Sequence, residues 1–202
     1  MPSRSIQRVF ILLLGPLFLA FGLGGCASLP SLEDRTISLA MTDTDDTRLG
    51  RAIAPQVAAH PGLSGIHPLL DARNAFAARV LLARTAERSL DVQYYIWHPD
   101  MSGTLMFEAL HEAAERGVRV RLLLDDNNAA GLDPILAALD AHANIEVRLF
   151  NPFPVRGPAV FGYLTDFPRL NRRMHNKSFT ADNQATIVGG RNIGDEYFGA
   201  DE

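Results

Sequence analysis

Strand-like and helix-like segments alternate between residues 71 and 150, and this alternation restricts the fold more than any other feature of the sequence. Strand patterns of alternating or continuous apolar residues cover 90–97, 118–124 and 145–150. Amphipathic helix patterns cover 71–88, 102–116 and a segment that begins at Asp133-Pro134. Parallel strands joined by helices require right-handed crossovers. We therefore predict an α/β fold with a largely parallel sheet and helices packed against it.

Composition excludes several classes of protein. A chain of 202 residues with a net charge of -4 and 47% hydrophobic residues is neither a disordered tail nor a wholly basic nucleic-acid binder. Its single cysteine, Cys26, excludes an internal disulfide and any metal site built from several thiolates. We expect one globular domain stabilised by a buried core.

The amino-terminal segment has the pattern of a secretion signal. Arg4 and Arg8 precede an apolar run over 9–23, which is shorter than the roughly 20 residues that span a bilayer. The end of this run, Leu-Gly-Gly-Cys26, resembles the lipobox of bacterial lipoproteins, in which the cysteine is acylated after cleavage. A plain signal peptide or an anchor helix is the alternative. We interpret 1–25 as a lipoprotein signal peptide.

Acylation at Cys26 would place the protein in the bacterial cell envelope, anchored to a membrane and facing the periplasm. By the lipoprotein resemblance, Ala27 favours the outer membrane over the inner one. Residues 26–65 are polar, acidic and interrupted by prolines, so we expect a lipid-anchored tether before a domain at 66–202. An ordered extension packed on the domain through Ile53, Val57 and Leu63 is the alternative.

Several polar residues fit either a functional or a structural role. Asp125 and Asp126 follow a predicted strand at the edge where ligands of parallel sheets gather, but turn and capping roles are commoner for such a pair. The same two interpretations, functional and structural, apply to His98. The remaining histidines outside the motif described next lack metal-ligand spacing; they are His60, His67, His111 and His142. We predict no metal site.

The chemistry is concentrated between residues 172 and 192, which read RRMHNKSFTADNQATIVGGRN. His175 and Lys177, the single lysine, are two residues apart, so on an extended strand their side chains point the same way. This pairs a nucleophilic imidazole with a cation. Gly189-Gly190 ends the next apolar strand and exposes backbone amides to an anion, and Asn192 adds an amide donor. These groups fit a phosphate site.

The pattern HxKxxxxD followed by GxxN resembles the signature of the phospholipase D superfamily. The matching residues are His175, Lys177, Asp182, Gly189 and Asn192. Many members have Gly-Ser where this chain has Gly189-Gly190, so a serine hydroxyl is missing here. The stretches 68–98 and 164–183 also resemble the cardiolipin-synthase-like branch, and the likeness extends over most of the chain beyond 65. It implies one half of a phospholipase D-like mixed sheet flanked by helices.

The resemblance implies a phosphodiester exchange without a cofactor. His175 would attack phosphorus to form a phosphohistidine, and Lys177 and Asn192 would neutralise the non-bridging oxygens. Asp182 belongs to the signature, but strand geometry places it about 16 Å along the chain from Lys177. We predict that Asp182 sits in a hairpin turn with Asn183 and holds the two motif strands in register through side-chain hydrogen bonds.

In this superfamily a second motif of the same kind protonates the leaving alcohol. The single lysine of this chain is already used, so the second motif must come from elsewhere. We favour an amino-terminal piece of a longer enzyme, incomplete at its carboxyl end, over a homodimer of one-motif chains.

Aromatic residues between Phe150 and Phe167 lead directly into the motif and offer a path for acyl chains, although they fit a core equally well. Residues 156–191 carry six basic side chains against two acidic ones, as phosphate binding requires. We favour a phosphatidyltransferase acting on a glycerophospholipid such as phosphatidylglycerol at a membrane. The alternatives are a phospholipase D hydrolase, a phosphodiesterase or nuclease, and a non-catalytic fragment; no nucleic-acid groove is evident.

Overall fold

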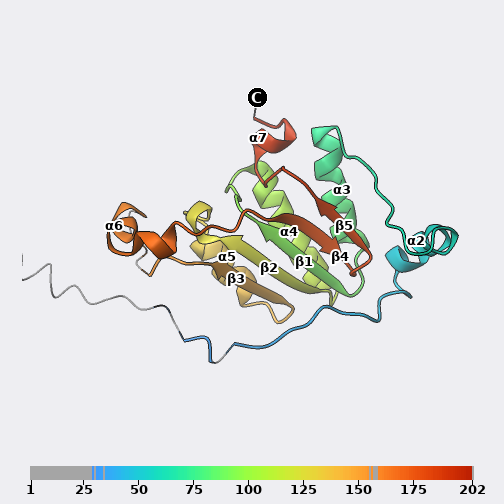
Figure 1. Cartoon of the computed structure of the whole chain (residues 1–202), viewed down its shortest axis with the longest axis horizontal. Coiled ribbons are helices and arrows are strands. Elements are labelled where there is room, and N and C mark those ends of the chain that lie inside the picture. Colours follow the sequence, from blue (N-terminus) through green and yellow to red (C-terminus); the bar gives the residue numbers. More distant parts are fainter. Residues whose placement is uncertain (1–28, 30, 34, 155, 157–158, 202) are drawn as a thin grey trace, which may run out of the picture. The chain divides into compact units, whose positions relative to one another are not determined.

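A computed structural model describes residues 29, 31–33, 35–154, 156 and 159–201 (Figure 1). The predicted signal peptide, Cys26 and Ala27 lie outside these residues. Residues 35–202 form one compact unit, and 1–34 form another. In the described part of 1–34, the Glu33 amide donates a hydrogen bond to Ser31 Oγ.

The larger unit is built on a mixed five-stranded sheet in the order β3-β2-β1-β4-β5. The strands are β1 (Ser89–Tyr94), β2 (Arg119–Asp125), β3 (Ile145–Phe150), β4 (Lys177–Ala181) and β5 (Ala185–Val188). β1, β2 and β3 run parallel, as the alternation of strands and helices predicts. β4 and β5 form an antiparallel hairpin, and β4 pairs antiparallel with β1. The fold is therefore the mixed α/β sheet expected from the resemblance.

The helices are α2 (Arg48–Ala59), α3 (Ala72–Thr85), α4 (Met101–Glu115), α5 (Asp133–Asp140), α6 (Ala159–Leu170) and α7 (Asp195–Phe198), with a 3-10 turn η1 (Asp126–Asn128). α4 begins one residue before the expected Ser102, because Asp100 is the N-cap and its carboxylate accepts from the Gly103 amide. The predicted strand over 90–97 ends early, at Tyr94.

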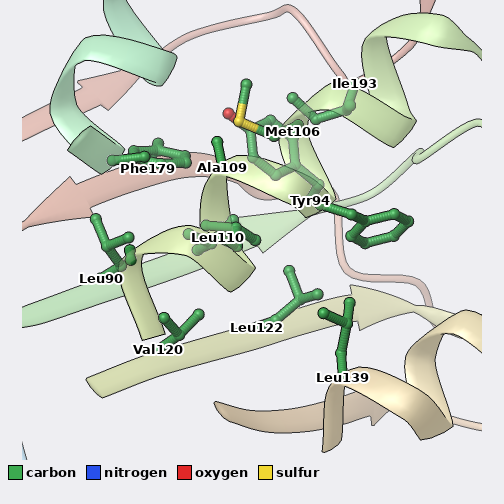
Figure 2. Close-up of a cluster of buried hydrophobic side chains, with 14 of the residues drawn as sticks. Leu90, Tyr94, Met106, Ala109, Leu110, Val120, Leu122, Leu139, Phe179 and Ile193 are labelled. Carbon is green, nitrogen blue, oxygen red and sulfur yellow. The ribbon is translucent and has the colours of Figure 1, made fainter. Parts of the chain in front are cut away.

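The core lies between α4 and one face of the sheet (Figure 2). Met106 and Leu110 of α4 meet the buried side chains of alternate residues in the strands, such as Leu122 and Phe179. Full burial of a side chain of this size contributes about 2 kcal/mol to stability. This packing holds β1, β2 and β4 in place. The motif lies at the edge of the sheet where β1 and β2 end and β4 begins.

The stretch predicted as a tether contacts the domain over part of its length. Ser38 accepts a hydrogen bond from Arg121 on β2 through its carbonyl, at 2.9 Å, and Thr36 accepts one from Arg148 on β3. Further along, α2 leaves Val57 exposed, and Leu63 beyond it is exposed as well. Of the three residues considered for apolar docking, Ile53 is partly buried, whereas Val57 and Leu63 are not docked. Within the described residues, no helix is both long and apolar enough to cross a membrane.

Candidate active site

The carboxyl end of β1 brings the motif residues together. β4 begins at Lys177, which pairs with Tyr94 at the end of β1, and His175 lies two residues before it. The parallel strand β2 ends at the same edge with Asp125. Residues from distant parts of the sequence therefore meet where two parallel strands end, the place at which open α/β sheets bind ligands.

His175 and Lys177 converge on one aromatic ring. The imidazole of His175 lies 4.7 Å from the ring of Tyr95, measured between centroids, with a tilt of 54°. The Lys177 ammonium lies 5.1 Å from the centroid of the same ring. The sequence prediction that the two side chains lie side by side agrees with these contacts. His175 itself is exposed, so its imidazole is accessible to a substrate.

Lys177 is unusually enclosed for a lysine. Only 9% of the residue is exposed, and its Nζ donates to the His175 carbonyl at 3.2 Å. Burial lowers the pKa of the Lys177 ammonium below its ordinary value of 10.5, because removal from water disfavours the charged form. A poorly hydrated ammonium gains more from contact with an incoming phosphate than a hydrated one does.

Asn192 is held against the same strand end by a short ladder of hydrogen bonds. The Ile96 amide donates to Asn192 Oδ1 at 3.1 Å, which leaves the NH₂ group of the carboxamide as the donor side. The Ile193 amide donates to the Ile96 carbonyl, and the His98 amide donates to the Ile193 carbonyl. Burial raises the pKa of the nearby Tyr197 hydroxyl, an effect that its hydrogen bond with Asn192 partly offsets.

The glycine turn between β5 and Asn192 leaves open space. A Cβ placed at Gly189 or Gly190 would meet no atom within 4 Å, so their backbone is accessible to a ligand. Both glycines also line a cavity of about 440 Å³ together with residues 65–69 and Arg79. None of His175, Lys177 and Asn192 lines that cavity, so it is separate from the reacting groups.

Arg191 occupies the variable position just before Asn192, and its guanidinium binds backbone carbonyls of this chain rather than a phosphate. Its guanidinium donates to the carbonyls of Leu69 and Leu70, at 3.0 and 2.9 Å. These bonds tie the segment before α3 to the glycine turn. The chain thus uses this position to hold its own backbone.

Asp182 is buried at the opposite end of β4. It lies in the hairpin turn with Asn183, as predicted, and both have positive φ, of 51° and 52°. The prediction that its side chain links the two motif strands is wrong. The carboxylate instead accepts hydrogen bonds from the amides of Glu87, Arg88 and Ser89, which lead into β1. With no exposed surface, Asp182 cannot touch a substrate, so its role is structural.

Asp125 and Asp126 prove to be anchors. The buried Asp125 carboxylate accepts from the Met174 amide at 2.8 Å and from Arg173 at 3.0 Å, immediately before His175. Asp126 accepts from the Phe153 amide and from Arg156. Both carboxylates are therefore committed to the connection that leads into the motif. The capping interpretation is confirmed for Asp125, which is the N-cap of η1 and accepts from the Asn127 amide at 2.9 Å, whereas Asp126 forms long-range contacts instead.

His98 also lacks a reacting partner. Its Nε2 lies 3.6 Å from a Glu196 carboxylate oxygen, and both side chains are about half exposed. This is a contact between two half-exposed side chains, of small energetic weight. The His98 backbone contributes more, through its place in the ladder that holds Asn192.

One group of side chains in the described part of the chain has the residue types of a metal site. It comprises His111, Glu115 and His142, far from the motif. The Nδ1 of His142 accepts from the Asn144 amide at 3.1 Å, so the proton of the neutral ring belongs on Nε2, which contacts Glu115 at 2.9 Å. A metal at Nε2 would need that nitrogen deprotonated and Nδ1 acting as a donor. The group fits a hydrogen-bonded cluster better than a metal site.

Sequence reasoning missed Tyr95. Its position on the face of the strand opposite the core was visible, but not its contact with the motif. That contact depends on β4 pairing with β1 rather than with β3, and nothing in a single sequence specifies this pairing. The aromatic side chain at the carboxyl end of a predicted parallel strand was the available signal.

Comparison with known proteins gives a consistent family. Residues 81–202 match the family model described as "Cardiolipin synthase, PLD-like domain". The chain is 64% identical over 155 residues to cardiolipin synthase C of Escherichia coli strain K12, covering 77% of this chain and 33% of that protein. It is 38% identical over 197 residues to an uncharacterized protein of Helicobacter pylori, covering 96% of this chain and 38% of the relative. The chain thus spans about a third of the length of these relatives.

Among solved structures, NucT from Helicobacter pylori aligns with a TM-score of 0.46 at 17% identity, covering 63% of this chain and 72% of that one.

Proposed function

The chain belongs to the phospholipase D-like domain family of cardiolipin synthases, and from this membership we propose that it transfers phosphatidyl groups through a covalent histidine intermediate. One observation carries the proposal. The exposed imidazole of His175 and the nearly buried ammonium of Lys177 both contact the ring of Tyr95. A nucleophile next to a fixed positive charge is the arrangement that attack on an anionic diester requires.

In the first step an imidazole nitrogen of His175 attacks phosphorus. A nitrogen–phosphorus bond forms as the bond between phosphorus and the leaving alcohol oxygen breaks, and that oxygen takes up a proton. Negative charge grows on the non-bridging oxygens, to which we propose that the Lys177 ammonium and the Asn192 NH₂ group donate hydrogen bonds. Because these donors are held by the fold before substrate arrives, little reorganisation accompanies the reaction.

In the second step the hydroxyl of an acceptor alcohol attacks the phosphohistidine. The nitrogen–phosphorus bond breaks, the acceptor proton is removed, and His175 is regenerated. A glycerol or glycerophospholipid acceptor makes the reaction a transfer, whereas water makes it a hydrolysis. The likeness to cardiolipin synthase C favours a lipid alcohol, with phosphatidylglycerol as the substrate to test first.

The proton for the leaving alcohol needs a second acid. We propose that a second motif supplies it, from a further part of a longer protein or from a second copy of the chain. Within the described residues, the other histidines contact neither His175 nor Lys177. The length of the relatives favours a longer protein.

We also propose that Cys26 anchors the protein to a membrane of the bacterial envelope on its periplasmic side. Two or three acyl chains at about 0.8 kcal/mol per buried methylene give firm attachment. The test is the distribution of Cys26→Ser between soluble and detergent-extracted fractions. Cys26→Ser should leave the membrane fraction, and an unchanged distribution would contradict the anchor.

The catalytic proposal is tested by trapping the intermediate. Full-length protein is mixed with phosphatidylglycerol labelled at phosphorus and quenched in detergent at neutral pH, because acid cleaves phosphohistidine and alkali cleaves the acyl esters of the lipid. We expect labelled protein and a labelled phospholipid product in which a second phospholipid alcohol, such as another phosphatidylglycerol, is the acceptor. Phosphatidic acid alone would identify a hydrolase instead.

His175→Ala is the critical variant, and His98→Ala is its matched control. His175→Ala should lose both the label and the product, while the exposed His98 side chain should be dispensable. Label retained in His175→Ala would refute the nucleophile assignment. Cleavage of single-stranded DNA with no action on phospholipid would favour the nuclease alternative.

A further inference from the structure

The Tyr95 side chain contacts both His175 and Lys177 of the motif. It follows β1 directly and is half-buried. Its ring lies beside the imidazole of His175 and the ammonium of Lys177 at the distances given above. The signature HxKxxxxD contains no aromatic residue, so this contact adds a component that the motif itself does not specify.

We propose that Tyr95 is a positioning residue whose ring sets the orientation of the His175 imidazole and holds the Lys177 ammonium in place. The inference rests on the proposed function and deepens it. The ring acts through its face and edge, and its hydroxyl is not required. Tyr95 does not touch phosphorus in this proposal, and it takes no part in proton transfer.

The argument for the ammonium concerns the sign of the neighbouring charge. Among the described residues, no carboxylate forms an ion pair with Lys177. A carboxylate would hold the ammonium more strongly, but its negative charge would repel the phosphodiester and cancel the field of the lysine. An aromatic ring attracts a cation through its quadrupole and carries no net charge. The ring therefore fixes the ammonium and leaves its charge for the substrate.

The argument for the imidazole concerns its freedom to rotate. His175 is exposed and precedes β4, so strand packing does not restrict its side chain. A ring 4.7 Å away removes part of the rotational space and favours one tilted arrangement. Attack on phosphorus demands a defined line of approach, and small misplacements of a reacting group reduce rates severely.

The platform for this ring is itself well fixed. Tyr94 is fully buried beside it, and Ile96 is hydrogen-bonded to both Asn192 and Ile193. The backbone on both sides of Tyr95 is therefore held. Tyr95 links the first half of the motif, His175 and Lys177, to the strand end that also holds the second half.

The test compares Tyr95→Phe, Tyr95→Leu and Tyr95→Met in the full-length protein with labelled phosphatidylglycerol. Tyr95→Phe keeps the ring and should retain kcat within about threefold. Tyr95→Leu and Tyr95→Met should lower kcat and the rate of adduct formation by about tenfold to a hundredfold. KM should stay within about twofold of wild type, because the ring positions reacting groups and does not bind substrate. In Tyr95→Leu and Tyr95→Met, the basic limb of the pH profile of kcat should move to lower pH, because the ring no longer stabilises the Lys177 ammonium.

Phe76→Leu is the control for loss of an aromatic ring away from the motif, since Phe76 on α3 packs against Phe198. It should leave kcat unchanged. The inference is overturned if Tyr95→Leu and Tyr95→Met turn over within threefold of wild type. A loss in Tyr95→Phe as large as in Tyr95→Leu also overturns it, because the hydroxyl would then be the important group. The inference is also overturned if the loss of kcat in the Tyr95 variants is matched by a parallel fall in their melting temperatures.

A spectroscopic measurement separates this inference from the proposed function. In protein labelled at histidine, the His175 ring protons, assigned with His175→Ala, should be shifted upfield by the Tyr95 ring. The shift should persist in Tyr95→Phe and vanish in Tyr95→Leu. If wild type acts on no phospholipid, the proposed function fails, and this shift alone decides the position of the ring. Equal shifts in Tyr95→Leu and wild type overturn the inference.

Discussion

The two ends of β4 each carry a buried charged residue of the same motif, but the surroundings of the two charges differ. At the Lys177 end a charge is nearly buried and forms no ion pair with a carboxylate of the described residues, and an exposed imidazole is two residues away. At the Asp182 end a charge is fully buried and accepts hydrogen bonds from three successive backbone amides. The first charge is held only by the His175 carbonyl and the Tyr95 ring, whereas the second accepts hydrogen bonds from three backbone amides. The comparison teaches that one signature combines a reactive end and a structural end.

Lys177→Met gives the largest separation between the two ends. Turnover should fall by about a thousandfold, because the phosphate loses its fixed cation. The free energy of unfolding should nevertheless rise by about 1 kcal/mol, since a dehydrated charge is replaced by an apolar side chain of similar length. The measurements are product formation from labelled phospholipid and the urea midpoint.

Lys177→Arg tests whether charge alone suffices. The planar guanidinium is larger than the ammonium and cannot reproduce the compact point charge of the nearly buried lysine, so turnover should stay far below wild type. Near-native turnover in Lys177→Arg, or a clear loss of stability in Lys177→Met, would contradict the description of this end.

Asp182→Ala should have the reverse effect. Removal of the carboxylate leaves the amides of residues 87–89 without an acceptor in a buried place, and stability should fall by about 3 kcal/mol. Turnover per folded molecule should change little, because Asp182 lies at the far end of the strand from the reacting groups. Urea unfolding and active-site titration measure the two quantities. The exposed Asp201→Ala removes the same charge and should leave stability unchanged; an equal loss there would point to a general charge effect.

The sequence allowed the reactive end to be predicted better than the structural end. His175 and Lys177 are two residues apart, so they were expected on the same side of the chain; both contact the Tyr95 ring, although His175 lies just before β4. The partners of Asp182 are about 95 residues away in the sequence. They are backbone amides, which carry no residue-specific signal. For that reason the turn was predicted correctly and its hydrogen-bond partners were not.

The fold shows the same division. The parallel order of β1, β2 and β3 followed from the alternation of strands and helices, because crossover handedness leaves few other arrangements. The insertion of β4 beside β1 did not follow, since hairpins can join either edge of a sheet. Tyr95 was missed for this reason, and Asp125 was left undecided because its partner Met174 lies 49 residues away.

A change of pH should move the contributions of Lys177 to activity and stability in opposite directions. The pKa of Lys177 is lowered by burial, so between this value and 10.5 the unfolded chain binds more protons than the folded protein. In this window the stability contributed by Lys177 therefore rises with pH. Activity should fall over the same window as the ammonium is lost. Comparison of wild type with Lys177→Met by pH-dependent unfolding isolates the contribution of this group, and a difference independent of pH would contradict it.

Asn183→Ala changes only the hairpin turn, and it should have the smallest effect on stability of the substitutions considered. Asn183 has a φ of 52°, a conformation that asparagine tolerates and alanine does not, at a cost of about 1 kcal/mol. Asn183→Gly is the matched variant, and because glycine adopts positive φ freely it should be as stable as wild type. Thermal unfolding should therefore rank alanine below asparagine and glycine, with equal turnover in all three proteins. A loss of turnover in Asn183→Ala at full folding would mean that strain in the turn reaches Lys177 along β4, and the two ends of the strand would then not be independent.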